Sequence, residues 1–391
     1  MRVIFLAHSF PRYREDSAGS FLLRLAVALR EYETIQVHVI APGAPGLSAT
    51  EELDGVTVER YRYAPRRLET LAYTGTMAED VRSSWTAKFA LSGLLTSQVQ
   101  RGVRAVGSFA ADVIHAHWWF PAGLAGAAIS MMARAPLVTT MHGSDVRLAR
   151  GMPSARSAMR YILSRSQAIT AVSSWLAREA LDVAPLSQPV VAPMPVDTAV
   201  FIPPATTQRL DDQFLFVGRL NVQKGIDHLL RALAAMRTRA TLEVVGDGPM
   251  RQEMERLAGS LNISDRIRWR GTVAHGSLPQ HYGSSTALVV PSVEEGLGLV
   301  AAEAMLCGTP VIAYDSGGLP DIVRHEQTGL LVPPGDVPAL ASALDRLLAR
   351  PDRGRSLGEY GRIHAISTFA PAAVAARYAA VYRAALGKQA S

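Results

Sequence analysis

Short apolar runs rich in β-branched residues alternate along the chain with segments of helical periodicity. This alternation is typical of parallel sheets built from strand–helix–strand units. In the first half of the chain, strands are predicted at Val3–Ala7, Val37–Ile40, Val56–Tyr61, Val113–His117, Leu137–Thr140 and Ala168–Val172. The helices predicted there are Gly19–Glu31, Ser84–Val106, Gly123–Ala133, Arg156–Leu163 and Ser174–Leu181.

The same alternation starts again in the second half. Its predicted strands are Gln213–Val217, Thr241–Val245, Ile267–Arg270, Ala287–Val290, Pro310–Ala313 and Gly329–Val332. Its predicted helices are Gly225–Arg237, Met250–Ser260, Leu299–Leu306, Pro338–Ala349 and Ala373–Leu386. The repeated pattern predicts an α/β protein of two Rossmann-like domains facing each other across a cleft, with ligands beyond the carboxyl ends of the strands.

A proline-rich segment, Gln188–Gln208, separates the two halves. Proline lacks the backbone N–H donor and fixes φ, so neither a helix nor a central strand runs through such a segment. We interpret it as the interdomain linker; the alternative is a long surface loop within one domain. The predicted domains are residues 1–194 and 195–369, with a C-terminal helix at 370–391 that packs back onto the first domain.

The composition narrows the class of protein. A length of 391 residues fits two domains. With 48% hydrophobic and 19% charged residues a disordered chain is excluded, and the single Cys307 excludes a disulfide framework. The longest apolar stretch, Phe120–Ala133, is shorter than the roughly 20 residues of a membrane-spanning helix. The apolar run at the start is too short for a signal sequence, so we expect a cytoplasmic protein.

Residues 291–310, which read PSVEEGLGLVAAEAMLCGTP, carry the most informative chemistry. They follow a predicted strand, pass through a loop with two glycines and open a helix. The first helical amides, near Leu299 and Val300, have no partner within the helix and can bind an anion. Glu295 lies in the loop and Glu303 about one turn inside the helix. Carboxylates accept hydrogen bonds from vicinal hydroxyls, so sugars are their natural partners, although Glu303 could instead compensate the helix dipole.

A second stretch, Phe214–Gly225, runs from a hydrophobic strand into a loop and a helix start. Arg219 and Lys224 lie five residues apart in that loop. Two such cations can converge on a diphosphate, because Arg offers a bidentate fork and Lys a point charge. The alternative for such a pair on its own is a solvated loop.

Two further patterns, VVGDGP at 244–249 and GTPV at 308–311 followed by Gly317-Gly318, complete the order of motifs. Together with the two stretches above, they closely resemble the retaining nucleotide-sugar glycosyltransferases of family 4. Glu295 and Glu303 match the Glu-x7-Glu motif of that family in residue type and spacing. The resemblance spans nearly the whole chain and implies the GT-B fold.

The resemblance implies that a sugar moves from a UDP- or GDP-linked donor to an acceptor, with retention at the anomeric carbon. Glu303 would hold the ribose diol and Glu295 the sugar hydroxyls. Arg219 and Lys224 would bind the diphosphate. The backbone amides that would assist at the phosphate are those of Gly298, Leu299 and Val300.

No metal or other cofactor is expected. Preorganised cations and amides stabilise charge on a leaving group without a metal. No Asp-x-Asp sequence stands at a strand end where a metal-bridged phosphate would need it. No second carboxylate is placed as a covalent nucleophile, which agrees with the front-face mechanism proposed for the family.

The first half of the chain carries matching motifs. Asp16 and Gly19 lie between the first strand and its helix, similar to the glycine loop of the family at the donor diphosphate. Residues 140–145, TMHGSD, resemble one of its two histidine motifs, and His142 would be the active-site histidine that contacts the transferred sugar.

Residues 112–121, DVIHAHWWFP, resemble the other histidine motif. His115 and His117 fit a structural role in the core as readily as a role in the site, and Trp118 and Trp119 could line an acceptor site or pack in the core. The candidate residues on the acceptor side are Asp16, His117, Asp145 and Arg147.

The net charge of +6 is unevenly distributed. Residues 1–196 carry 20 Lys and Arg against 15 Asp and Glu, whereas the remainder carries 20 against 19. Six arginines and no acid lie between Val146 and Arg178. We therefore expect this face to meet a phosphorylated acceptor sugar, glycolipid or small molecule at an anionic membrane, which would place the protein at the inner face of the cell membrane. The alternative is an ordinary solvated basic face.

The predicted function is sugar transfer in the synthesis of a cell-envelope glycolipid, polysaccharide or related glycoconjugate. Two alternatives are a GT-B epimerase and a sugar-nucleotide-binding protein without transfer activity. Epimerases lack the Glu-x7-Glu spacing, and the complete set of motif residues argues against the inactive protein. Nucleic acid is a poor partner, since no basic motif with interleaved aromatic residues occurs.

Overall fold

The computed structural model describes residues 1–16, 18–75, 77–185, 188–205 and 209–387. The chain divides into two compact units, each described by itself below. Unit 1 comprises Met1–Pro195 and Pro371–Ser391, and unit 2 comprises Val196–Ala370. Residues 206–208 of the predicted linker and residues 388–391 of the predicted C-terminal helix lie outside the described residues.

Unit 1 is built on an eight-stranded sheet in the order β3-β4-β2-β1-β5-β6-β7-β8. Its strands are β1 (Arg2–Leu6), β2 (Gln36–Pro42), β3 (Thr50–Leu53), β4 (Val56–Tyr61), β5 (Val113–His117), β6 (Leu137–Met141), β7 (Ala168–Ala171) and β8 (Val190–Val191). Neighbouring strands run parallel except β3, which is antiparallel to β4. β1 and β5 are buried along almost their whole length, as expected of parallel strands with helices on both faces.

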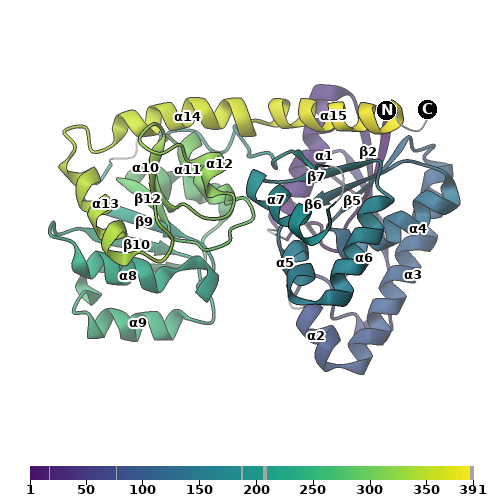
Figure 1. Ribbon diagram of the computed structural model, residues 1–391, viewed down its shortest axis with the longest axis horizontal. Helices are drawn as coiled ribbons and strands as arrows, with labels where there is room; N and C mark the ends of the chain where they lie inside the picture. The colour runs from purple at the N-terminus through teal and green to yellow at the C-terminus, as the bar shows by residue number, and fades with distance from the viewer. Residues whose placement is uncertain (17, 76, 186–187, 206–208, 388–391) are drawn as a thin grey trace. The chain divides into compact units, whose positions relative to one another are not determined.

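Helices cover both faces of this sheet. They are α1 (Ser20–Glu33), α2 (Met77–Ser83), α3 (Trp85–Ser108), α4 (Leu124–Ala133), α5 (Ser144–Gly151), α6 (Pro153–Ser164), α7 (Ser174–Val183) and α15 (Pro371–Gly387), with short helical turns at Arg66–Leu68 and Trp119–Gly123. α3 packs against α4 over β1 and β5. α15 returns from unit 2 and lies along α1 on the other face (Figure 1), so the C-terminal helix completes the core of unit 1.

Unit 2 has a six-stranded, fully parallel sheet in the order β11-β10-β9-β12-β13-β14. Its strands are β9 (Gln213–Val217), β10 (Thr241–Val245), β11 (Ile267–Gly271), β12 (Ala287–Val290), β13 (Val311–Tyr314) and β14 (Gly329–Val332). Its helices are α8 (Ile226–Ala235), α9 (Arg251–Ser260), α10 (Leu278–Ser284), α11 (Leu299–Leu306), α12 (Leu319–Ile322), α13 (Val337–Ala349) and α14 (Arg355–Phe369), with single turns at Val222–Lys224, Ser264–Arg266 and His275–Ser277.

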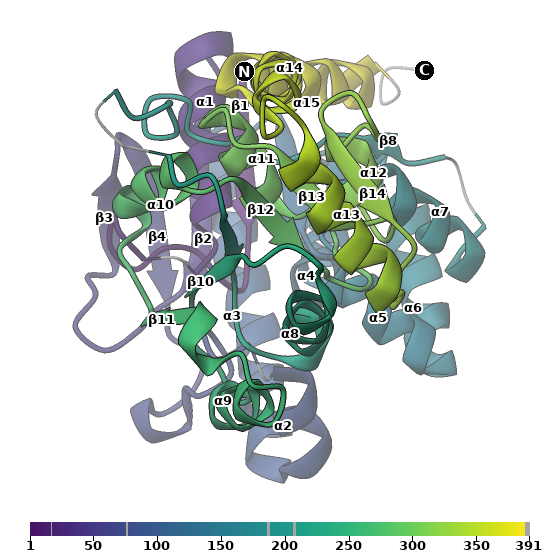
Figure 2. The ribbon, with the colours of Figure 1, turned by 90° about the vertical axis from the view of Figure 1, so that its left-hand side faces the viewer.

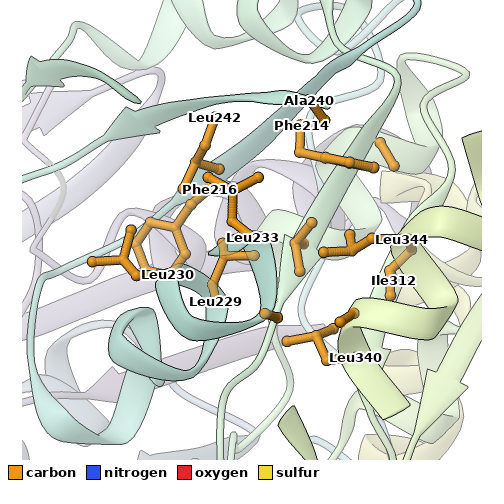
Figure 3. Packing of buried hydrophobic residues seen from close by; sticks show 14 of the residues in the cluster. Phe214, Phe216, Leu229, Leu230, Leu233, Ala240, Leu242, Ile312, Leu340 and Leu344 are labelled. Carbon is orange, nitrogen blue, oxygen red and sulfur yellow. The ribbon is translucent and has the colours of Figure 1, made fainter. Parts of the chain in front are cut away.

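The core of unit 2 lies between its sheet and the helices α8 and α13. Phe214 and Phe216 of β9 meet Leu229 and Leu233 of α8, and all four are at most 2% exposed (Figure 3). α10 and α11 lie on the opposite side of the sheet from α8 (Figure 2). Both faces of the sheet are therefore covered, and the loops at the carboxyl ends of the strands remain for ligands.

The predicted α/β class with two parallel-sheet domains is confirmed. The helix α14 was not predicted, because its sequence carries two glycines and weak apolar periodicity. Its glycines have a packing reason: a Cβ at Gly358 would overlap the carbonyl oxygen of Gly308 at the end of α11. The strand β3 was also not predicted, because its sequence TEEL lacks the apolar residues that mark a strand. Such a polar strand is tolerated at the edge of a sheet, and β3 is an edge strand. No helix in the described ranges combines the length and the apolar character needed to cross a bilayer.

Candidate active site

The two motif stretches of unit 2 meet where its strand order reverses. β9 and β12 are neighbours, with β10 and β11 on one side and β13 and β14 on the other. The loops that leave the carboxyl ends of β9 and β12 therefore lie next to each other. Ligands of open α/β sheets bind at this kind of position.

Close backbone contacts lock these two loops together. Gly225 has a φ of +62°, and a Cβ on it would overlap the carbonyl oxygen of Pro291. The N–H of Val293 donates to the carbonyl oxygen of Gln223 at 2.9 Å, and Nε2 of Gln223 donates to the carbonyl oxygen of Glu294 at 3.1 Å. The loops form one rigid frame for the side chains that they carry.

Lys224 and Glu295 form an ion pair within this frame. Nζ of Lys224 donates to Oε2 of Glu295 at 2.6 Å, and the two side chains are 21% and 16% exposed. The structure thus brings together two residues that the sequence assigned to different parts of the donor. The side chain of Arg219, the other predicted diphosphate ligand, is exposed in the same loop.

The backbone of Glu295 is held from the opposite side by the segment that follows β13. The N–H of Gly318 donates to the carbonyl oxygen of Glu295 at 2.8 Å, and the N–H of Glu294 donates to Oγ of Ser316 at 3.0 Å. Gly317 has a φ of +61°, and a Cβ on it would overlap the backbone of Glu295. The paired glycines of the sequence therefore fix the loop that presents Glu295.

Glu303 of α11 is buried, with its side chain 6% exposed. The hydroxyl of Tyr282 donates to its Oε2 at 2.9 Å, and Nε2 of His275 lies 3.3 Å from its Oε1. Burial and the charge of Glu303 raise the pKa of Tyr282 well above its usual value, so the phenol remains a hydrogen-bond donor. Sequence reasoning missed both partners, because they come from α10 and the turn before it, which carry no recognisable motif.

The start of α11 is shaped by Gly298, which has a φ of +89°. The first intrahelical bond runs from the N–H of Ala301 to the carbonyl oxygen of Gly298 at 2.9 Å. Leu299 and Val300 precede that bond and are partly exposed. Their amides thus lie in the first turn of α11, directly after the loop that holds Glu295.

In unit 1 the strand order reverses between β1 and β5, and the loop after β1 carries Asp16 and Gly19. Asp16 is 4% exposed and accepts from Nε of Arg12 at 2.6 Å. Burial would raise the pKa of Asp16, but its bonds from Arg12 and from backbone amides lower the pKa below its usual value. Gly19 has a φ of +72°, and a Cβ on it would lie 2.6 Å from the carbonyl oxygen of Ser9.

Arg60 supports this loop from β4 and was missed by sequence reasoning. Its side chain is 1% exposed and pairs with Glu51 at 2.7 Å. It also donates to the carbonyl oxygens of Phe10 and Pro11. An arginine inside a strand gives no signal from sequence alone, because solvated arginines on strands are far more common.

Three histidines gather at the ends of β5 and β6. His115 and His117 are both fully buried on the same face of β5, and His142 follows β6 and is partly exposed. Nδ1 of His117 lies 3.2 Å from Nε2 of His142, and Nε2 of His115 lies 2.6 Å from Oγ1 of Thr140. Burial lowers the pKa of His115 to about 3 and, with help from neighbouring histidines, lowers the pKa values of His117 and His142 well below the usual range.

Asp145, buried at the start of α5, holds the loop that carries His142. Its Oδ1 accepts from the N–H groups of His142 at 3.2 Å and Gly143 at 2.9 Å, and its Oδ2 accepts from the N–H of Trp119 at 3.2 Å. Burial raises the pKa of Asp145, and these hydrogen bonds oppose that rise. Asp145 therefore acts on the backbone of the loop, whereas Arg147, two residues further along α5, is exposed.

The two tryptophans after β5 are both buried. Trp119 donates its Nε1–H to the carbonyl oxygen of Asp145 at 2.7 Å and is 2% exposed. Trp118 has a φ of +68°, and its ring centroid lies 4.5 Å from that of His142. Trp119 is thus a core residue, while Trp118 packs against the ring of His142.

Comparisons with known proteins follow the same division of the chain. Residues 18–200 match the family described as Glycosyltransferase Family 4, and residues 205–364 match the family described as Glycosyl transferases group 1. A GDP-mannose-dependent alpha-(1-6)-phosphatidylinositol monomannoside mannosyltransferase of Mycobacterium tuberculosis is 33% identical over 268 residues, 62% of this chain and 69% of the relative. The 2-deoxystreptamine glucosyltransferase of Streptomyces kanamyceticus is 30% identical over 84% of this chain and 89% of its own.

A solved structure shows the same fold over almost the entire length. The sucrose-phosphate synthase of Thermosynechococcus elongatus has a TM-score of 0.80 and 26% identity, covering 98% of each chain. The two parallel-sheet units are thus those of a GT-B protein.

Proposed function

The chain belongs to glycosyltransferase family 4 and transfers a sugar from a nucleotide-sugar donor, and we propose that it does so with retention at the anomeric carbon. The family supports transfer rather than the epimerase or the inactive binding protein considered above.

The ion pair of Lys224 and Glu295 carries the proposal. Both side chains are accessible to a ligand, and they lie on loops that the glycines around them hold rigid. A donor diphosphate offers Lys224 a stronger anionic partner, which frees Glu295 to accept hydrogen bonds from the transferred sugar. Lys224 and Arg219 then stabilise the charge that develops on the leaving diphosphate, so we propose that transfer needs no metal.

The other donor contacts follow from the same loop and helix. Glu303 has one oxygen engaged by Tyr282 and the other near His275, and we propose that it holds the ribose hydroxyls. The amides of Gly298, Leu299 and Val300 assist at the phosphate, and His142 of unit 1 contacts the transferred sugar. We propose that the loop after β1, which carries Asp16 and Gly19, takes part in binding the donor diphosphate or the acceptor.

A thermal-shift screen over UDP-, GDP- and ADP-sugars tests the donor assignment, since a ligand raises stability by mass action. We expect one nucleotide class to raise the unfolding temperature of the wild type and not of Lys224→Ala. Arg256→Ala, which removes an exposed cation from α9 of the same unit, serves as the matched control. The NMR couplings of the product show its anomeric configuration, and an inverted configuration would refute retention. Chelation of metal ions tests the metal-free proposal. We expect full activity after chelation, and a loss of activity would refute that proposal.

We further propose that unit 1 binds its acceptor at an anionic membrane surface. The exposed cations of α5 and α6 include Arg156 and Arg160. Nη2 of Arg82, at the end of α2, lies 3.2 Å from Sδ of Met152 at the start of α6, so the cation of Arg82 adjoins this helix. Trp85 and Phe89, one turn apart at the start of α3, follow Arg82 closely in the chain and are 77% and 56% exposed. Exposed aromatic residues flanked by cations are typical of surfaces that enter the headgroup region of anionic bilayers.

Sedimentation with vesicles of anionic or neutral lipid tests this surface. We expect binding to anionic vesicles that falls in Arg156→Ala/Arg160→Ala and in Trp85→Ala. Tyr360→Ala, which removes an equally exposed aromatic residue from unit 2, should leave binding unchanged. Equal binding by the wild type and the double arginine variant would refute the membrane role and leave a solvated basic face.

A further inference from the structure

The surroundings of His117 and His142 determine which of the two rings donates the hydrogen bond between them. Both rings are neutral at physiological pH, because burial lowers their pKa values and the positive charges of His115 and His8 would add to that effect. A neutral imidazole carries one N–H and one lone pair. With Nδ1 of His117 at 3.2 Å from Nε2 of His142, one of these two nitrogens donates and the other accepts.

The remaining nitrogen of His117 decides between the two arrangements. Nε2 of His117 is buried and has no hydrogen-bond partner among the described residues. If His142 donated, the proton of His117 would sit on this Nε2 as a buried, unpaired N–H group. If His117 donates from Nδ1, its Nε2 carries only an unpaired lone pair. Buried N–H groups without partners are rarer than buried acceptors without partners, so the second arrangement is favoured.

Resting on the proposed role of His142 in transfer, we propose that His117 is a positioning residue that donates to Nε2 of His142 and so keeps the proton of His142 on Nδ1. His142 then presents a single N–H, at Nδ1, as a donor to a hydroxyl of the transferred sugar. Within the described ranges no protein group is bonded to that Nδ1. The side chain of His142 is also partly exposed, so a ligand can reach it.

The rings around the pair prevent it from rearranging. The ring of His117 lies 4.7 Å from Phe5 and 4.0 Å from His115, measured between centroids. His115 is itself fixed by the hydroxyl of Tyr382 on α15, 2.7 Å from its Nδ1. The ring of Trp118 also lies against that of His142, with the two planes tilted by 38°. The C-terminal helix therefore supports, through His115, the histidine that orients His142.

Long-range ¹H–¹⁵N NMR on protein labelled at histidine tests the proposal without any substrate, because the pattern of cross-peaks distinguishes the Nδ1–H from the Nε2–H form. His142→Gln identifies the signals of His142. We expect the Nδ1–H form for His142 in the wild type. The Nε2–H form there would overturn the proposal, whatever the activity of the enzyme, so this readout does not depend on the donor assignments being right.

Two variants of His117 test whether its hydrogen bond keeps His142 in the Nδ1–H form. His117→Asn places an amide N–H where Nδ1 was, whereas His117→Gln reaches instead to the position of Nε2. We expect His117→Asn to keep His142 in its Nδ1–H form and His117→Gln to populate the Nε2–H form and lower kcat about ten-fold further, with KM for the donor unchanged. An unchanged Nδ1–H form in His117→Gln, or equal losses of kcat in the two variants, would overturn the proposal.

Discussion

The candidate residues of the two units differ in charge and in how they are held. In unit 1, His117, His142 and Asp145 are mostly buried, the imidazoles are neutral, and the carboxylate is bonded to backbone amides. In unit 2, Lys224 and Glu295 are charged, partly exposed and bonded to each other. Unit 1 therefore offers fixed orientation, and unit 2 offers charge.

This difference indicates where binding energy is used. Exchanging one partner of this ion pair for a ligand of the same charge costs less than breaking the pair, because the remaining charge stays compensated. A buried network of neutral donors and acceptors is expensive to rearrange, since every unpaired group loses its hydration. Unit 2 can thus exchange partners when the donor binds, while unit 1 has its geometry in place beforehand.

Breaking the charged pair should give the largest effect. Lys224→Ala and Glu295→Ala should each lower transfer about 10³-fold, because preorganised charge at the leaving group and the sugar is lost. Neither should lower the unfolding temperature by more than a few degrees, since the remaining partner is accessible to water. Steady-state turnover and calorimetry of the same samples measure both. Near-wild-type turnover in either variant, against Arg256→Ala as control, would show that the pair is not part of the donor site.

The sequence predicted the charged region better than the buried one. The loops with Lys224 and Glu295 are marked by glycines whose positive φ values and close contacts the structure explains, and they follow strands with clear apolar runs. Polar residues that follow a parallel strand gather at one edge of the sheet, so their proximity follows from topology.

The partners that orient these residues were not predictable in the same way. Tyr282 and His275 approach Glu303 from another helix and a turn, and Arg60 reaches the loop after β1 from β4. Such contacts depend on tertiary packing rather than on local pattern. His115 is a further example, since its bond to Tyr382 joins residues 267 positions apart.

Acidification should destabilise unit 1 more than unit 2. Burial lowers the pKa of His8 to about 4 and that of His115 to about 3, and lowers those of His117 and His142 as well. The unfolded chain binds these protons below a pH of about 6.5, whereas the folded unit does not, so stability present above pH 6.5 is lost as the pH falls. For each fully buried imidazole, the free energy of unfolding falls by about 1.4 kcal/mol per pH unit in that range.

Hydrogen exchange read by mass spectrometry between pH 7.5 and 5 measures this loss in each unit. Protection corrected for the intrinsic rate should fall in β5 and β6 and much less in β9 and β12. In the described part of unit 2, His364 is the one histidine with a lowered pKa, and the lowered pKa of Glu243 acts only below this window. The raised pKa of Asp145 works in the opposite sense, but it is one group against four. Equal loss in both units would show that the buried histidines do not set the difference between them.

A smaller effect is expected from Asp145→Asn in unit 1. The amide keeps the size of the carboxyl but places an NH₂ group against a backbone N–H of His142, Gly143 or Trp119. One buried hydrogen bond becomes a donor–donor contact, which should destabilise the protein by about 2 kcal/mol. Urea unfolding measures the loss, with the exposed Asp182→Asn on α7 as control. A variant as stable as the control would show that the loop around His142 does not depend on Asp145.

The smallest predicted effect concerns Glu303, the one buried carboxylate among the unit 2 candidates. If it accepts hydrogen bonds from the ribose, the wild type should bind UDP or GDP about ten-fold more tightly than the 2′- or 3′-deoxy forms. Glu303→Gln should lose most of that preference, because an amide has one acceptor oxygen and Tyr282 already donates to this side chain. Calorimetric titration measures both affinities, and the exposed Glu326→Gln should behave as the wild type. If the preference for ribose survives in Glu303→Gln, the residue only anchors α10 to α11 through Tyr282, and unit 2 then contributes charge but no ribose recognition.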